Sequence, residues 1–265
     1  MVTTIKVKEK LKKYYKKAKS ILSLSFSLAK VKFKLRNEGS YLGIFWYLLN
    51  PLAMFSIFLF LGNIINKKTI EHYPVYLLLG LIMFNIFRGA TDASTSSIAG
   101  NAGIIKSMKV SFEPFVISGV LQSVFSHFFE ILVLIAFLIY FQIPLGGLLF
   151  YPFILFLLVL FIIGFSFTLA ALGTYISDIS NIWSIMVNLT WFAAPVFYVV
   201  TKGDVPFINS INPMFYFITA ARDIIIYETF PDFKIILLMV AFGFGSLAIG
   251  LFIFEKNKHR FPEAV

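Results

Sequence analysis

Long apolar runs separated by short polar segments occupy most of the chain between residues 42 and 254. A helix that crosses the hydrocarbon core of a bilayer needs about 20 predominantly apolar residues. Six segments meet this requirement: 42–65, 74–98, 114–141, 148–176, 182–200 and 234–254. The pattern therefore predicts an all-α polytopic membrane protein with six transmembrane helices.

The segment before the first run has an ambiguous pattern. Its apolar residues alternate with serines, as in a β-strand, at Leu22, Leu24, Phe26 and Leu28. They also fit helical spacing at Ile21, Leu24, Leu28, Val31 and Leu35. A lone strand at a membrane surface leaves its backbone groups unpaired, whereas a helix satisfies them internally. We therefore expect an amphipathic interfacial helix that lies in the headgroups, with its lysines on the opposite face.

The connection between the fifth and sixth runs is interrupted by Pro206, Pro213 and Pro231. These prolines interrupt its apolar stretches too often for the segment to span the bilayer twice. We expect one or two short helices that dip into or lie on the outer face of the membrane.

Composition and charge support a membrane protein. Hydrophobic residues make up 59% of the chain and charged residues 14%, whereas soluble domains have about 45–50% and about 25%. The net charge of +10 does not indicate nucleic-acid binding, because twelve of the 23 Lys and Arg precede the first apolar run: Lys6, Lys8, Lys10, Lys12, Lys13, Lys16, Lys17, Lys19, Lys30, Lys32, Lys34 and Arg36. This asymmetry predicts that the N-terminus is cytoplasmic, and an even number of spans then places the C-terminus there too.

These features divide the chain into three parts. Residues 1–40 form a basic cytoplasmic tail with the interfacial helix, residues 41–255 the six-span domain, and residues 256–265 a second cytoplasmic tail. The stretch ILSLSFSLA after the basic head imitates a signal peptide. Its serines and the four cations that follow disfavour cleavage and translocation.

Four ionisable residues lie within predicted spans, where each costs about 2.5–3.5 kcal/mol at the helix centre. Arg88 and Asp92 share a face of the second span, and His127 and Glu130 share a face of the third. Either Arg88 pairs with Asp92 or Glu130 and connects two helices, or the four groups line a path for a hydrophilic cargo. A metal site at His127 and Glu130 is disfavoured, because no third ligand accompanies them.

The chain has no cysteine and contains no G-x-S-x-G, H-E-x-x-H or G-x-x-x-x-G-K-[ST] motif. We therefore expect no catalytic, cofactor-binding or metal-binding residues, and any energy from ATP must come from a partner. Most of the 33 Phe residues are expected to face lipid or the interface. The aromatic residues that we consider as pore candidates are Phe45, Trp46, Tyr47, Trp191, Phe197 and Tyr198.

The stretch LRNEGSYLGIFWYLLNP joins the interfacial helix to the first span. Arg36 marks the cytoplasmic headgroup limit. Pro51 cannot donate a hydrogen bond to the carbonyl of Tyr47, so we expect the first span to bend there.

The order of several motifs resembles one family over roughly residues 20–255. The motifs are YLGIFWYLLNPL, SIAGNAGIIKSMKVSFEPF, APVFY and INPMFYFITAARDIII. Together they are similar to the permease subunit of polysaccharide-exporting ATP-binding-cassette transporters, which export O-antigen, teichoic acid or capsule.

The resemblance implies a homodimer of permeases in the bacterial cytoplasmic membrane, with two separate ATPase subunits that bind ATP and Mg²⁺. The cargo would be an undecaprenyl-linked polysaccharide, which crosses the membrane in a pore at the dimer interface. The interfacial helix, at about 21–36, and the loop 101–114 would dock on the ATPase, with Lys34, Arg36, Lys106, Lys109 and Glu113. Residues 205–227 would form gate helices, with Asn212, Pro213, Tyr216 and Arg222.

One position departs from the family's pattern. Where the family often has Arg-Asp before the fifth span, this chain has Ser177-Asp178, and we expect Asp178 to cap the following helix. Three other functions remain as alternatives: a drug- or lipid-exporting permease of the same superfamily, a membrane enzyme that acts on polyprenyl-linked sugars, and an ion or solute carrier. The scattered carboxylates disfavour the enzyme, and the absence of an inverted repeat disfavours the carrier.

Overall fold

The computed structural model describes residues 2–36, 38–65, 72–107, 110–200 and 205–264. Within these ranges, the side chains described exclude those of residues 2–11, 13–14, 44, 47–48 and 62–65. The secondary structure of the described residues is entirely helical. This confirms the predicted all-α class.

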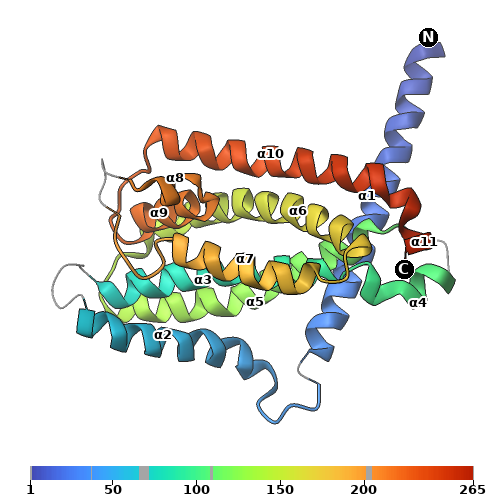
Figure 1. The fold of residues 1–265 in the computed structure, drawn as a ribbon. Helices are drawn as coiled ribbons and strands as arrows, with labels where there is room; N and C mark the ends of the chain where they lie inside the picture. Colours follow the sequence, from blue (N-terminus) through green and yellow to red (C-terminus); the bar gives the residue numbers. More distant parts are fainter. Residues whose placement is uncertain (1, 37, 66–71, 108–109, 201–204, 265) are drawn as a thin grey trace.

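Long helices run side by side and form a bundle (Figure 1). They are α2 (Trp46–Ile65), α3 (Tyr73–Thr95), α5 (Glu113–Tyr140), α6 (Tyr151–Tyr175), α7 (Ile179–Ala193) and α10 (Phe233–Asn257). One end of the bundle carries the short helices α8 (Phe207–Ile211) and α9 (Pro213–Ile225). The other end carries α1 (Val2–Leu35), α4 (Ala102–Ser107) and α11 (Phe261–Ala264). Short 3-10 turns join them at Gly43–Phe45, Ala99–Asn101, Leu145–Leu149 and Lys258–Arg260.

Four helices in the described part of the chain are long and apolar enough to cross a membrane: Tyr73–Thr95, Glu113–Tyr140, Tyr151–Tyr175 and Phe233–Ala264. They correspond to the second, third, fourth and sixth predicted spans. In α2, the apolar stretch with described side chains is Leu49–Leu61. Helix α7 has 15 residues, which at 1.5 Å per residue makes it about 22 Å long, shorter than the ~30 Å hydrocarbon core.

The fifth predicted span, 182–200, extends past the helix that the structure contains. Helix α7 ends at Ala193, and Ala194 has an extended backbone with φ −90° and ψ 143°. Ala194 precedes Pro195, and the proline ring disfavours a helical conformation in the residue before it. The hydrophobic run therefore continues while the helix stops.

Helix α3 lies at the centre of the bundle, with its side chains buried from Val75 to Phe84. Helices α6 and α10 pack against each other with their backbones almost in contact. A Cβ atom added to Gly250 would overlap the carbonyl oxygen of Gly164, and one added to Gly164 would overlap the backbone of Ser246. Small residues permit this close packing, in which Ser246 Oγ donates to the carbonyl of Phe161 at 2.9 Å.

Helix α1 crosses the end of the bundle at a steep angle to the other long helices (Figure 1). This confirms that the ambiguous segment is a helix. Of its predicted apolar face, Leu24, Val31 and Leu35 are exposed, whereas the small residues Ser25 and Ala29 are fully buried against the bundle. Small side chains let α1 approach α5 closely.

A lysine also lies on the packed face of α1. Lys32 Nζ donates to Ser118 Oγ of α5 at 2.9 Å, and burial lowers the pKa of Lys32 from its usual value. The prediction that all lysines lie on the opposite face is therefore wrong at this position.

Candidate functional site

A polar cavity of about 400 Å³ lies between α2, α3, α5 and the junction of α1 with α2. Its polar lining residues are Arg36, Asn50, Asn85, Arg88, Asp92, Ser123, Ser126 and Glu130, and Trp46, Pro51 and Met54 are among the others. The cavity brings together three of the four predicted intramembrane ionisable residues, and it adds Asn85, Ser123 and Ser126, which the sequence analysis did not identify. Polar groups on three helices of a membrane bundle thus face one space.

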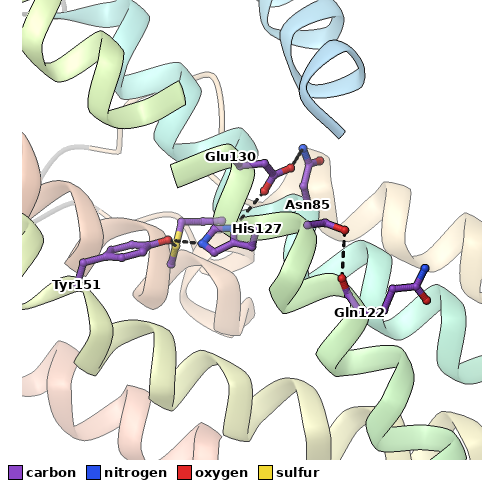
Figure 2. A network of polar contacts seen from close by, with 7 residues as sticks. Asn85, Gln122, His127, Glu130 and Tyr151 are labelled. Carbon is purple, nitrogen blue, oxygen red and sulfur yellow. Dashed lines mark hydrogen bonds and ion pairs between the residues drawn. The ribbon is translucent and has the colours of Figure 1, made fainter. Parts of the chain in front are cut away.

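The carboxylate of Glu130 also belongs to a buried network behind the cavity (Figure 2). His127 Nδ1 lies 3.0 Å from Glu130 Oε2, and Asn85 Nδ2 donates to Glu130 Oε1 at 3.2 Å. His127 Nε2 lies 2.6 Å from the hydroxyl oxygen of Tyr151. The network therefore connects α3, α5 and α6.

Both protonation states of His127 fit this network. In the neutral ring, Nδ1–H donates to Glu130 and Nε2 accepts the hydroxyl proton of Tyr151. In the charged ring, both nitrogens donate, and the Tyr151 hydroxyl can then donate to Met83 Sδ, 3.1 Å away. His127 is 1% exposed and lies behind Glu130, so it positions that carboxylate and does not itself line the cavity.

Arg88 forms a hydrogen bond that neither interpretation of this residue named. Its Nη2 donates to Asn188 Oδ1 on α7 at 2.9 Å, and Arg88 also lines the cavity together with Asp92 and Glu130. Both oxygens of Glu130 are already engaged by Asn85 and His127, which leaves the guanidinium free to reach α7. The expected connection between two helices therefore exists, but it joins α3 to α7.

In the predicted gate segment, α9 is mostly buried and α8 mostly exposed. Asn212 caps α9, since its Oδ1 accepts from the backbone N–H of Met214 at 3.0 Å, and Pro213 follows as the first helical residue. Asn212 Nδ2 donates to the carbonyl of Thr190 at 3.0 Å. The hydroxyl of Tyr216 donates to the carbonyl of Ser210 at 2.7 Å. These bonds tie α8 and α9 to each other and to α7.

Arg222 of α9 is 3% exposed, although the sequence analysis placed it in an external connection. Its Nη2 donates to the carbonyls of Tyr76 at 3.0 Å and Val196 at 2.8 Å, and its Nη1 donates to the carbonyl of Pro195. The carbonyls of Pro195 and Val196 follow the end of α7, where no helix continues to satisfy them. Arg222 supplies the missing donors.

The aromatic pore candidates have different environments. Trp191 is 8% exposed and packs with Phe58 and Phe197 at ring-centre distances of 4.8 Å and 5.3 Å. The hydroxyl of Tyr198 accepts from Asn209 Nδ2 at 2.7 Å. Phe45 and Trp46 are exposed, and Trp46 lines the cavity. The side chain of Tyr47 lies outside the described residues.

The docking candidates also differ from one another. Lys34, Arg36 and Lys106 are exposed, and Lys109 lies outside the described residues. Glu113 is 8% exposed, and its Oε1 lies 3.6 Å from Lys258 Nζ, so its carboxylate already has a partner within the chain. The docking role of all five residues stays a prediction.

The predicted cap of α7 is wrong. Asp178 occupies the N-cap position, but its side chain forms no capping hydrogen bond. Its backbone has φ −85° and ψ 2°, whereas a capping side chain usually requires an extended backbone at this position.

Comparison with known proteins relates this architecture to a family. The sequence profile of the ABC-2 type transporter family matches residues 24–226. The O-antigen export system permease protein RfbA of Myxococcus xanthus is 23% identical over 247 residues, which cover 91% of this chain and 95% of the relative. The protein of the same name from Klebsiella pneumoniae is 27% identical over 234 residues, which cover 87% and 90%. Because the family profile covers most of its length, the chain belongs to the ABC-2 type transporter family, and it is a multi-pass membrane protein.

Proposed function

We propose that this chain is the permease subunit of an ATP-driven exporter and that its cargo is a lipid-linked polysaccharide of the O-antigen type. The observation that carries the proposal is the alignment with relatives named O-antigen export permeases, which covers 87–91% of the chain. The family profile, over residues 24–226, contains every residue that lines the polar cavity.

The proposed topology has six spans, formed by α2, α3, α5, α6, α7 and α10. Their side-by-side arrangement supports this count (Figure 1). Helix α7 is short, and the α8–α9 segment occupies the remaining membrane depth on the outer side as a pair of gate helices. An even number of spans puts both termini on one side, and the basic N-terminal region makes this the cytoplasmic side of a bacterial inner membrane.

The proposed assembly is a homodimer with two ATP-binding-cassette subunits, which bind ATP and Mg²⁺. The chain itself has no phosphate-binding loop, so the energy for transport enters from these partners. They dock at the end of the bundle that carries α1 and α4. ATP binding then favours one of two arrangements of the permeases, as a coupled conformational change requires.

The polar cavity supports a hydrophilic cargo. Sugar hydroxyls can both donate and accept, and the cavity is lined by the guanidinium of Arg88, which can donate, and by the exposed carboxylate of Asp92, which can accept. Trp46 adds a flat ring on which the apolar face of a sugar can stack. A drug- or lipid-exporting relative is the second candidate, but an apolar cargo would form no hydrogen bond with the polar groups that line the cavity.

Purification of the chain with its cognate ATPase, followed by reconstitution in nanodiscs, tests the proposal. We expect an undecaprenyl-linked saccharide to raise the ATPase rate several-fold over the rate with phospholipid alone. Hydrophobic drugs at matched concentration serve as the comparison. Stimulation by drugs and not by the saccharide would contradict the proposed cargo.

A further inference from the structure

A second cavity, of about 460 Å³, lies beside α9 at the end of the bundle that the proposed topology places outside. We call it the outer pocket, and its lining residues include Tyr76, Val199, Ser210, Tyr216, Arg222 and Ile235. Among the described residues, it shares no lining residue with the polar cavity. Tyr76 of the outer pocket and Arg88 of the polar cavity are about 18 Å apart along α3, at 1.5 Å per residue. The outer pocket is therefore a separate site.

Hydrogen bonds fix the walls of the outer pocket relative to one another. The guanidinium of Arg222 joins α9 to α3 and to the chain after α7. The hydroxyl of Tyr76 donates to the carbonyl of Tyr198 at 2.9 Å, and the hydroxyl of Tyr216 joins α9 to α8 through the carbonyl of Ser210. A cavity whose walls are held in this way is preformed, as small-molecule sites usually are, and its volume lies within their usual range of about 300–1,000 Å³.

The outer pocket has a buried floor and opens at the surface of the chain. On its floor, Tyr76 and Phe215 are 4% and 6% exposed. At its opening, Val199 and Tyr227 are 51% and 44% exposed. A ligand that arrives from outside can therefore enter and be enclosed on several sides.

The aromatic residues of the lining suit a sugar. They include Tyr76, Phe215, Tyr216 and Tyr227. A tyrosine combines an apolar ring with a polar hydroxyl, and a sugar likewise combines an apolar face of C–H groups with hydroxyls at its edge. The hydroxyls of Tyr76 and Tyr216 donate within the chain, but their oxygens can still accept from a sugar hydroxyl. Tyr227, at the opening, offers a partly exposed ring for stacking.

The charges of the described lining residues are balanced. Arg222 and Lys234 are cations, and Asp223 and Asp232 are anions. A cleft lined by charges of one sign attracts an ion, and this balanced set favours a neutral ligand. In the described part of the chain, no group of three His, Cys, Asp or Glu could hold a metal ion. A sugar can donate to the exposed carboxylate of Asp232 and accept from the exposed ammonium of Lys234, whereas a lipid acyl chain can do neither.

We propose that the outer pocket is a saccharide-binding site that holds sugar units of the glycan on the outer side of the membrane. The inference rests on the proposed function, which supplies the saccharide, and it goes beyond that function by assigning a second site separate from the polar cavity. Sugar units bound at this site resist the return of the glycan through the membrane.

The first test labels a single thiol in the outer pocket. Because the chain has no cysteine, Thr219→Cys places one thiol in the lining with little change of volume. The full chain in nanodiscs is treated with a water-soluble maleimide, with and without a lipid-free oligosaccharide released from the organism's own surface polysaccharide. We expect the oligosaccharide to slow labelling at Thr219→Cys at least fivefold. It should not slow labelling at Ile208→Cys, the control on α8, where the side chain is 61% exposed.

Two results of this labelling would overturn the inference. One is a labelling rate at Thr219→Cys that the oligosaccharide leaves unchanged. The other is a Thr219→Cys thiol that does not react at all, because a binding site must be open to a ligand in water.

The second test changes the opening of the pocket and measures binding of the same oligosaccharide by calorimetry. Val199→Trp narrows the opening, and we expect the dissociation constant to rise at least tenfold. Leu149→Trp, at an outer position that is 80% exposed, is the matched control and should leave it unchanged. Asp232→Ala removes an acceptor whose side chain forms no capping hydrogen bond with α10, and it should raise the dissociation constant at least threefold. Wild-type affinity in both Val199→Trp and Asp232→Ala would overturn the inference.

Further outcomes separate this inference from the proposed function. If undecaprenyl-linked saccharide does not stimulate the ATPase of the wild-type complex, the proposed function fails, and labelling of Thr219→Cys still decides whether the pocket binds saccharide. If the ATPase is stimulated but the oligosaccharide does not protect Thr219→Cys, the inference fails alone. A photoreactive phospholipid that labels the pocket equally with and without oligosaccharide would identify a lipid site and would also overturn the inference.

Discussion

The guanidinium of Arg222 lies 3.3 Å from the ring centre of Tyr76 and donates to the backbone carbonyl of the same residue. One arginine of α9 is thereby fixed to the central helix α3 and, through Val196, to the chain that follows α7. The close approach requires Gly80, because a Cβ atom there would lie 2.6 Å from Arg222 Nη2. The end of the bundle that carries α8 and α9 is organised around this contact.

Arg222→Lys should destabilise this end of the bundle. An ammonium group lacks the planar fork that reaches several carbonyls at once, and each buried carbonyl left without a donor costs about 1–3 kcal/mol. We expect a lower melting temperature in detergent, measured by size-exclusion chromatography after heating. Arg260→Lys, at an exposed position, is the control. Equal melting temperatures for the two variants would contradict the role of Arg222.

Gly250→Val should separate α6 from α10. The new side chain would overlap the backbone of Gly164, and overpacking of this kind typically costs about 1–3 kcal/mol. Gly245→Val lies on the same helix, where an added Cβ meets no atom within 4 Å, so it changes helix propensity equally without the overlap. We expect a loss of folded protein for Gly250→Val alone. The account of this packing fails if both variants are equally stable.

Tyr151→Phe should weaken the network behind the cavity. It removes the hydroxyl that faces His127 Nε2, and a buried polar atom without its partner costs about 1–3 kcal/mol. The melting temperature should therefore fall. Tyr140→Phe, where the tyrosine is 79% exposed, should leave it unchanged. A Tyr151→Phe variant as stable as wild type would show that the hydroxyl is dispensable.

Much of the fold follows from local pattern, and this part was predictable. The structure contains the helical α1 and four of the predicted segments as helices long and apolar enough to cross a membrane. Apolar length and internal hydrogen bonding of the backbone are properties of a single segment, so the sequence alone can predict them. The packed face of α1 was missed, since its choice depends on how closely Ser25 and Ala29 can approach α5. The end of α7 was misplaced because hydropathy alone does not register the effect of Pro195 on Ala194.

The candidate site was predicted only in part. Arg88, Asp92 and Glu130 were found because ionisable residues are rare within apolar runs. The partners of Arg88 and Glu130 were not, since Asn188 and Asn85 lie on other helices and only the tertiary arrangement brings them near. The burial of Arg222 was missed for a related reason. Its acceptors are backbone carbonyls, which every residue has, so the sequence does not indicate where they lie. Helix α11 has four residues, too few for a helical pattern to be recognised in the sequence.

The central claim is that the polar cavity is part of an aqueous path for the glycan, and cysteine labelling tests it most directly. Ser126→Cys places a thiol at the cavity, and Phe156→Cys, at a position 56% exposed on α6, is the control on the surface of the span. A membrane-impermeant thiosulfonate reacts with the thiolate, which forms readily in water and not in hydrocarbon. In reconstituted complexes, we predict that Ser126→Cys reacts at least tenfold faster than Phe156→Cys and that undecaprenyl-linked saccharide slows this reaction. Equal rates at the two positions, or a rate at Ser126→Cys that the saccharide does not change, would contradict the account.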